Sequence, residues 1–391
     1  MLRRRTSDGR VARPTPPRVG IGMAAHFTVL RNDPHSNARL GRLATAHGAV
    51  ETPCFMPVGT QGTVKAVLPR DLHEMGCRLL LGNTYHLYLR PGHERIRRLG
   101  GLHRFMGWEG AILTDSGGFQ VYSLAKIRRI TEEGVHFQSH LDGSPHFLTP
   151  EKAAEVQEAL GSDIAMALDE CIPHDAPRNY VAASTARTIR WAERCLRSPR
   201  AAGQLVFGIV QGGVFEELRR RCSDALAPMA FEGFAVGGLG IGEGEEKLRA
   251  IAQFTAGSLP EDRPRYLMGV GRPQDIVEAV RAGYDMFDCV IPTRNARNGT
   301  LFTFQGKVNI KRAQFADDPR PVEEACGCYC CRNFSRAYLR HLYVAGEILS
   351  AELNSLHNLY FYHRLMDKCR EAIRAGRAGA WTEFHNIGAD V

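Results

Sequence analysis

Short apolar runs alternate with amphipathic segments from residue 52 to residue 291 of this 391-residue chain. The apolar runs are residues 54–58, 79–81, 111–114, 164–168, 205–210, 234–236, 265–270 and 286–291. The amphipathic segments are residues 149–160, 178–196, 215–229, 243–254 and 273–282. Strands that alternate with helices predict a parallel α/β sheet, and eight of them fit a (β/α)8 TIM barrel. A doubly wound open sheet is the alternative, but no G-x-G-x-x-G fingerprint follows the first run.

Two segments interrupt the alternation. Residues 122–147, after the third run, contain two β-like stretches around Asp142-Gly143 and predict a hairpin insertion. The second interruption follows the eighth run, from residue 300 to about residue 333, and holds a cysteine cluster. We therefore expect one TIM-barrel catalytic domain over residues 23–391, with a zinc-binding subdomain over about residues 300–360.

The formal net charge of +8 is concentrated in two places. Residues 1–22 hold six arginines and one aspartate, and residues 281–340 hold ten basic and six acidic side chains. The first segment predicts a disordered basic tail, with a transit peptide or a nucleic-acid arm as alternatives. No apolar run approaches the roughly 18 residues of a membrane helix, and mostly scattered cysteines suit a reducing cytoplasm.

Polar or glycine-rich residues follow several of the predicted strands, where the loops of a barrel converge on one mouth. They are Asp115 in ILTDSGGFQ, Asp169 in MALDEC, Gln211 in GIVQGG, Gly238 and Leu239 in VGGLG, Met268 in YLMGVG, and Asp288 in MFDCV. Together they predict a pocket for a flat ligand rich in donors and acceptors, such as a nucleobase. Paired carboxylates also suit glycosyl chemistry, in which one attacks the anomeric carbon and another handles the leaving group's proton.

The cysteines of CGCYCC offer three thiols at C-x-C-x-x-C spacing: Cys326, Cys328 and Cys331. Three thiolates need a fourth ligand to close a tetrahedral structural zinc site, and histidine commonly supplies it. His341 and His357, both on predicted helix, are the candidates, whereas Cys330 is too close to Cys331 to reach the same ion without strain.

These motifs resemble those of tRNA-guanine transglycosylases, the enzymes of the queuosine pathway. The matching stretches also include TPCFMPVGTQGTVK, LLLGNTYHLYLRPG, FDCVIPTRNARNG and LHNLYF, and they run from about residue 27 to residue 384. The resemblance implies a (β/α)8 barrel with a zinc-binding insertion and one structural Zn²⁺ per subunit. It also implies that His357, not His341, completes the zinc site with the three cysteines.

The resemblance further implies the roles of the barrel residues. Asp288 would be the nucleophile that attacks C1′ of the wobble guanosine, and Asp115 would be the general acid/base. Those that would bind the base are Phe119, which stacks on it, Met268 on the other face, and Asp169, Cys171, Gln211, Gly238 and Leu239. Arg294 and Arg297, just past the nucleophile, are placed to hold tRNA phosphates.

The family divides by incoming base. Bacterial members resemble this chain at Cys171, and the branched Ile241 should exclude the cyclopentenediol of queuine. We therefore expect exchange of guanine for preQ1 (7-aminomethyl-7-deazaguanine) in tRNAs with a GUN anticodon, those for Asp, Asn, His and Tyr. A cytoplasmic homodimer with no membrane association is the expected form.

Three other functions are weighed against this one. A nucleoside hydrolase-like glycosidase would pass the sugar to water. A catalytically inactive partner subunit would lack the carboxylates, yet Asp115 and Asp288 lie in intact motifs. A zinc-ribbon RNA-binding module with a structural barrel would bind tRNA without exchanging its base.

Overall fold

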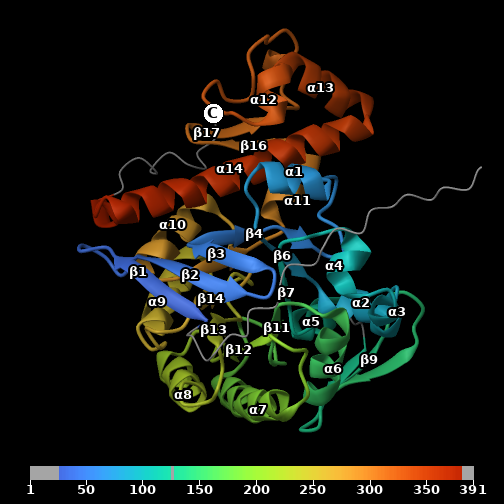
Figure 1. Ribbon diagram of the computed structural model, residues 1–391, viewed down its shortest axis with the longest axis vertical. Helices are drawn as coiled ribbons and strands as arrows, with labels where there is room; N and C mark the ends of the chain where they lie inside the picture. Colours follow the sequence, from blue (N-terminus) through green and yellow to red (C-terminus); the bar gives the residue numbers. More distant parts are fainter. Residues whose placement is uncertain (1–25, 125–126, 381–391) are drawn as a thin grey trace, which may run out of the picture.

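The computed structural model describes residues 26–124 and 127–380, and the tail predicted over residues 1–22 lies outside them. Its centre is a parallel sheet rolled into a barrel (Figure 1). The strand order is β4-β15-β14-β13-β12-β11-β7-β6-β5. Their bounds are β4 Cys54–Met56, β5 Val58–Gly59, β6 Leu79–Gly82, β7 Ala111–Thr114, β11 Ile164–Met166, β12 Leu205–Val210, β13 Gly233–Val236, β14 Arg265–Leu267 and β15 Met286–Asp288. The predicted (β/α)8 barrel is confirmed.

The first strand of the barrel closes the ring, and Pro57 divides this strand into β4 and β5. Proline has no N–H to donate, but its carbonyl still accepts a 3.0 Å hydrogen bond from the Leu81 amide. β4 pairs with β15 and β5 pairs with β6, both in parallel. The segment from β4 to β5 therefore connects the last barrel strand, β15, to the second, β6.

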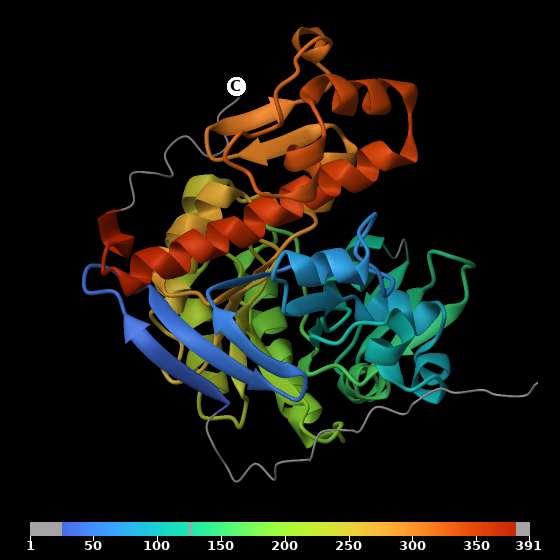
Figure 2. The same ribbon diagram turned by 45° about the horizontal axis from the view of Figure 1, so that its top comes forward.

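Helices surround the barrel (Figure 2). The five predicted amphipathic segments form α6 Pro150–Leu160, α7 Arg178–Arg197, α8 Glu216–Leu226, α9 Glu245–Ala256 and α10 Pro273–Ala282. Shorter helices follow the first three staves: α1 Pro69–Glu74, α2 Thr84–Leu89, α3 His93–Arg98, α4 Gly101–Met106 and α5 Gly118–Leu124. The start of α6 shows why such boundaries are readable, because the Thr149 hydroxyl accepts from the Lys152 amide and Pro150 opens the first turn.

A three-stranded antiparallel sheet that the sequence analysis missed closes the amino end of the barrel. It consists of β1 Phe27–Asn32, β2 Arg39–Thr45 and β3 Gly48–Thr52. Phe27, Leu43 and Val50 are buried in the same apolar cluster as side chains of the barrel interior. The sheet therefore plugs the end of the ring opposite to the strand ends with the predicted polar residues.

The segment expected to be a hairpin has one strand more. β8 Arg128–Ile130, β9 Val135–Gln138 and β10 Pro145–Leu148 form a meander in the order β10-β9-β8. The predicted turn at Asp142-Gly143 lies between β9 and β10, and Gly143 has the positive φ of 75° that favours glycine. The first turn, at Thr131–Gly134, contains two glutamates and was not recognised as a turn from the sequence.

After β15 and α11 Ile291–Arg297, the chain leaves the barrel and builds a smaller unit (Figure 2). It contains the hairpin β16 Thr300–Thr303 and β17 Gly306–Asn309, the 3-10 turn Ala313–Phe315, α12 Tyr329–Asn333 and α13 Arg336–Ala345. Leu301, Val308 and Leu339 belong to a separate apolar cluster of this unit. The long helix α14 Ile348–Arg374 then passes between this unit and the barrel and packs against both.

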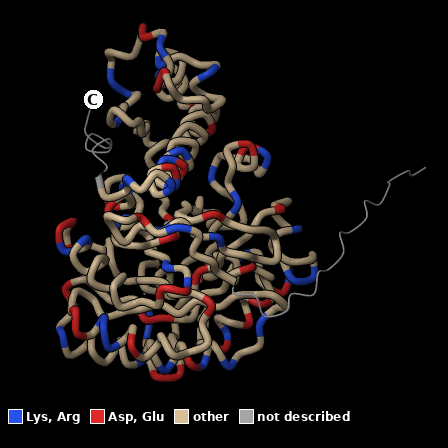
Figure 3. The backbone as a smooth tube through the Cα atoms, turned by 60° about the vertical axis from the view of Figure 1, so that its left-hand side comes forward, with Lys and Arg blue, Asp and Glu red and all other residues tan. Residues whose placement is uncertain are grey.

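Charged side chains of both signs are interspersed around the barrel (Figure 3), as expected for residues 23–280, which hold 29 basic and 29 acidic side chains. Among the described residues, no helix is long and apolar enough to cross a membrane.

A buried ion pair joins the amino-end sheet to the barrel. The Arg39 guanidinium donates to both carboxylate oxygens of Asp285, at 3.0 and 2.5 Å, and to the carbonyls of Glu261 and Arg263. The side chains of Arg39 and Asp285 are 4% and 0% exposed. Asp285 also accepts from the Arg265 amide at 2.7 Å.

Replacing Arg39 by methionine should lower the free energy of unfolding by about 3–5 kcal/mol, because it leaves the Asp285 carboxylate buried without its cation. Urea denaturation followed by circular dichroism measures this loss. Arg263→Met is the control, since Arg263 and its partner Asp262 are both exposed and such pairs contribute less than about 1 kcal/mol. Equal losses in the two variants would contradict the prediction.

Candidate active site and metal centre

The predicted polar residues all lie at the carboxyl rim of the barrel. Asp115 and Gln211 directly follow β7 and β12, Gly238 follows β13, Met268 follows β14, and Asp288 is the last residue of β15. Because parallel strands point the same way, these positions share one end of the ring.

Asp115 is buried and held entirely by neutral donors. Its Oδ2 accepts from Asn83 Nδ2 at 2.5 Å and from Gln120 Nε2 at 2.8 Å, and its Oδ1 accepts from the Thr84 amide at 2.8 Å. Burial raises the pKa of Asp115 to about 6, against these hydrogen bonds, and the nearby Asp288 carboxylate adds to the rise. A carboxyl group with this pKa can both give and take a proton near neutral pH.

Asp288 is held by one of its two oxygens. Tyr266 Oη donates to Oδ1 at 2.6 Å and the Gly269 amide donates to the same atom at 2.8 Å. In the described part of the chain, no hydrogen bond reaches Oδ2. Burial raises the pKa of Asp288 above its ordinary value, while the two hydrogen bonds oppose the rise. The carboxylate is therefore oriented, and one oxygen stays available for attack.

Asp169 and Gln211 form a hydrogen-bonded chain beneath the rim. Ser116 Oγ donates to Asp169 Oδ1 at 2.9 Å, and Gln211 Nε2 donates to Oδ2 at 2.7 Å. Gln211 Oε1 is buried and has no hydrogen-bond partner among the described residues. Gly238 has a φ of 69°, and a Cβ there would lie 2.4 Å from Gln211 Oε1. Glycine suits this positive φ and close approach, which leaves an unpartnered acceptor beside the half-buried Gly238.

The remaining predicted base-binding residues differ in exposure. Phe119, on α5, is 48% exposed, and its neighbour Gly118 lies so close to Asp169 that a Cβ would meet the Asp169 carbonyl at 2.7 Å. Cys171 and Leu239 are buried. Met268 is half-buried against the apolar interior of the barrel. The structure thus gathers one exposed ring, one thioether and polar groups at the same rim.

Four side chains that bind the three carboxylates were not among the predicted site residues: Asn83, Ser116, Gln120 and Tyr266. Each lies within a quoted motif, which is the signal that could have found them; Asn83 and Ser116 follow strands, Gln120 lies on α5 and Tyr266 lies within β14. The sequence does not indicate, however, which carboxylate each side chain contacts, because most of these hydrogen bonds connect different strands of the barrel or the loops that follow them.

Two arginines lie close to the nucleophile candidate, on α11. Arg294 is exposed and Arg297 is half-buried, with its Nη1 atom enclosed and without a hydrogen-bond partner in the described ranges. Neither arginine has an ion-pair partner among those residues. Burial and the charge of Arg294 lower the pKa of Arg297.

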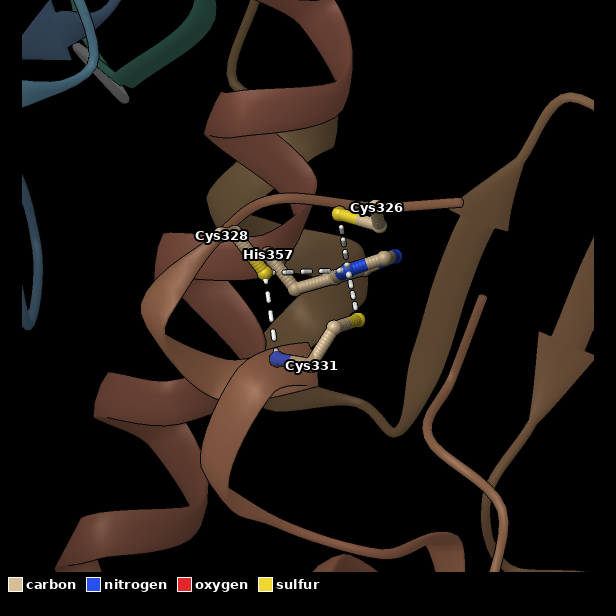
Figure 4. Close-up of side chains that lie close together, drawn as sticks. All are labelled: Cys326, Cys328, Cys331 and His357. Atoms are coloured by element: carbon tan, nitrogen blue, oxygen red, sulfur yellow. Dashed lines mark hydrogen bonds between the residues drawn. The ribbon is translucent and has the colours of Figure 1, made fainter. Parts of the chain in front are cut away.

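The four predicted metal ligands converge in the smaller unit (Figure 4). His357 Nδ1, from α14, lies 3.8, 3.6 and 3.3 Å from the sulfurs of Cys326, Cys328 and Cys331, and all four ligand atoms lie within 4.8 Å of one another. His357 Nε2 donates to the Phe302 carbonyl at 2.8 Å, which leaves the Nδ1 lone pair facing the sulfurs. His341 is exposed and outside this group. The cluster can therefore hold a metal ion in a closed shell.

Comparison with known proteins agrees with this geometry. The family described as Queuine tRNA-ribosyltransferase matches residues 33–386. The chain belongs to this family. A relative from Solidesulfovibrio magneticus, named Queuine tRNA-ribosyltransferase, is 59% identical over 347 residues, 88% of this chain and 93% of the relative. A relative of the same name from Caldanaerobacter subterraneus subsp. tengcongensis is 56% identical over 355 residues, 90% of this chain and 95% of the relative.

Family membership makes this chain a tRNA-guanine transglycosylase, which is a pentosyltransferase. The inactive-partner and binding-module alternatives do not agree with this membership together with intact carboxylates at the rim. The hydrolase alternative differs only in the acceptor of the sugar, so it is decided by assay.

The charge coupling between the two catalytic candidates gives a measurable expectation. Asp115 should be mostly protonated below pH 6 and mostly ionised above it. Asp288→Asn removes a neighbouring negative charge, so it should lower the pKa of Asp115 while leaving it above the usual aspartate value, because burial remains. NMR of ¹³C-carboxyl-labelled aspartate measures this pKa. Asp262→Asn, an exposed change, should leave it unmoved, and an unchanged or higher value in Asp288→Asn would be inconsistent with the coupling.

Proposed function

We propose that this transglycosylase replaces guanine at the wobble position of tRNAs with a GUN anticodon by preQ1, through a covalent intermediate on Asp288. The observation that carries the proposal is the pair of carboxylates at one rim, one half-buried with a free oxygen and one buried with a pKa of about 6. That difference separates a nucleophile from a proton carrier.

In the first step, Asp288 Oδ2 attacks C1′ of the guanosine ribose and forms a C1′–O bond as the bond from C1′ to guanine N9 breaks. The electron pair of the broken bond stays on guanine. Tyr266 and the Gly269 amide hold Oδ1, so the carboxylate keeps its orientation as its charge is consumed.

Asp115 gives its proton to the departing guanine and becomes ionised. In the second step the ionised Asp115 takes a proton from the incoming base, whose nitrogen then attacks C1′ and releases Asp288. Asn83, Gln120 and the Thr84 amide stabilise the ionised form that exists between the two steps.

The base is read by the groups beneath the rim. A purine-like base has a donor for the unpartnered Gln211 Oε1 and for the Asp169 carboxylate, while the Gly238 and Leu239 backbone contributes further polar groups. Phe119 would stack on one face of the base and Met268 would cover the other, with Cys171 lining the pocket.

The choice of incoming base is assigned to Ile241, in the loop that follows Gly238 and Leu239. Its amide donates to Glu243 Oε2 at 3.0 Å, and its branched side chain favours preQ1 over queuine.

The proposed contacts with RNA rest on the positive charges of two arginines. Arg294 and Arg297 are cations without acidic partners in the described residues, six and nine positions beyond Asp288, and they suit the phosphates beside a flipped wobble nucleotide. A homodimer in the cytoplasm stays part of the proposal and rests on family resemblance alone.

We assign the Cys326, Cys328, Cys331 and His357 cluster to a structural Zn²⁺, one per subunit. Three thiolates and one imidazole are the ligand set and number that zinc prefers in closed tetrahedral sites. The ion would have no role in the reaction, because its shell leaves no position for substrate.

The reaction is tested by incubating the protein with unmodified tRNA of GUN anticodon and labelled guanine, then with preQ1 or queuine as competitor. Label should enter the RNA and preQ1, not queuine, should displace it. Release of free ribosyl product from small nucleosides without exchange would favour the hydrolase instead.

Asp288→Asn should lower exchange by at least about 10³-fold and give no denaturant-resistant protein–RNA adduct, because an amide cannot form the ester-like bond to C1′. Gel mobility after denaturation detects the adduct. Asp262→Asn is the matched control and should behave as the parent protein. A normal adduct yield in Asp288→Asn would rule out this nucleophile.

Removal of zinc should loosen the smaller unit first. His357→Ala, or a chelator with a thiol-blocking reagent, should lower the bound zinc from one equivalent to near zero and expose residues 300–345 to protease. Elemental analysis and limited proteolysis measure the two effects. His341→Ala should keep one equivalent, and zinc retention by His357→Ala would exclude His357 as a ligand.

A further inference from the structure

A second cluster of ligating side chains lies at the amino end of the barrel, away from the catalytic rim. His47 is in the turn between β2 and β3, His103 is on α4, and Asp163 directly precedes β11 (Figure 1). Their three ligand atoms lie within 4.8 Å of one another. Nothing in the proposed reaction uses these residues.

The geometry is centred on the Asp163 carboxylate. His47 Nδ1 lies 2.8 Å from Oδ1 and His103 Nε2 lies 3.0 Å from Oδ2. The two imidazoles are stacked, with ring centroids 3.6 Å apart and planes 14° apart. Backbone amides of His47 and Ile112 donate to the same two oxygens at 3.1 and 2.8 Å, so main chain as well as side chains hold the carboxylate in place.

The charge of this carboxylate is unusual. The Asp163 side chain is 0% exposed, and its only ion-pair partners among the described residues are the two histidines. The buried carboxylate of Asp285, at the same end of the barrel, is paired with Arg39 instead. A buried carboxylate must be hydrogen-bonded or paired with a cation, and Asp163 faces two amide N–H groups and two imidazole nitrogens that can also ligate a metal ion.

The distances are suitable for a metal ion. In octahedral coordination, two neighbouring ligand atoms about 2.1 Å from the ion subtend a right angle at the ion and lie about 3.0 Å apart. In tetrahedral coordination the same two atoms lie about 3.4 Å apart. The nitrogen–oxygen separations of 2.8 and 3.0 Å match the first arrangement. His47 is 38% exposed, so water can reach the remaining coordination positions.

We infer that His47, His103 and Asp163 form a second metal site, which binds a divalent first-row transition ion of octahedral preference, with water completing its shell. Binding forms two metal–nitrogen bonds and a metal–carboxylate bond. An imidazolium in the cluster releases one proton to solvent, and a neutral ring moves its proton to the other nitrogen. The ion would clamp the β2–β3 turn and α4 onto the start of β11.

The test uses Ni²⁺ and the full chain with its cysteine cluster already loaded with zinc, so that the two sites are distinguished. Isothermal calorimetry should give one equivalent of Ni²⁺ per chain. His103→Gln keeps an N–H donor toward Asp163 but lacks the imidazole ligand, and His47→Asn does the same in the turn. Each should weaken Ni²⁺ binding by at least about tenfold.

His26→Ala is the matched control, because His26 is an exposed histidine of the same sheet region and outside the cluster, so its affinity should equal that of the parent. Co²⁺ in place of Ni²⁺ should show weak visible bands and no thiolate charge-transfer absorption, which separates this site from the cysteines. Ni²⁺ should also raise the thermal unfolding midpoint of the parent but not of His103→Gln. The inference would be overturned if the protein showed no saturable Ni²⁺ binding, or if both cluster variants bound Ni²⁺ as the parent does. The three side chains would then form a hydrogen-bonded cluster without a metal ion.

Discussion

Holding three largely desolvated carboxylates without a cation is the constraint around which the carboxyl rim of the barrel is arranged. Among the described residues, no lysine or arginine pairs with Asp115, Asp169 or Asp288, and burial raises the pKa of all three. A desolvated carboxylate is tolerated only when hydrogen bonds replace its water. The donors come from neighbouring strands and their loops, so these hydrogen bonds form only when those strands are paired.

The two ends of the barrel solve the same electrostatic problem differently. At the amino end, Asp285 is neutralised by Arg39 and Asp163 is paired with histidines. At the carboxyl end, the donors are neutral amides, hydroxyls and backbone N–H groups. An arginine at the rim would hold a carboxylate ionised and occupy its oxygens, whereas neutral donors leave it able to exchange a proton or attack carbon.

The parts of the fold that could be predicted are those with local signals. The eight apolar runs form the eight strand positions of the barrel, and the five amphipathic segments form α6 to α10. The sheet β1–β3 was missed, because β2 has the sequence RLGRLAT and its alternation is interrupted by Gly41, which lies against Phe27 and Thr52. The third strand of the meander was missed because the centre of its first turn is occupied by Glu132 and Glu133, and glutamate is not a typical turn residue.

The candidate site shows the same division. Cysteine spacing predicted three ligands from one short segment, but the choice between His341 and His357 depends on which helix packs over β16, and that is a tertiary contact. The carboxylates were visible as strand-end residues. Their partners were not, since Asn83 and Asp115 lie on different staves and nothing local relates them.

The pairing of the first barrel strand, β4, with the last, β15, also affects how the chain can be made. β4 cannot complete its pairing until β15 has left the ribosome, roughly 230 residues later, which at 5–20 residues per second is about 10–50 s of synthesis. During that interval the hydrogen-bonding edge of the first stave and the apolar face of the β1–β3 sheet have no permanent partner. Until β15 has been made, only transient contacts can cover these two surfaces.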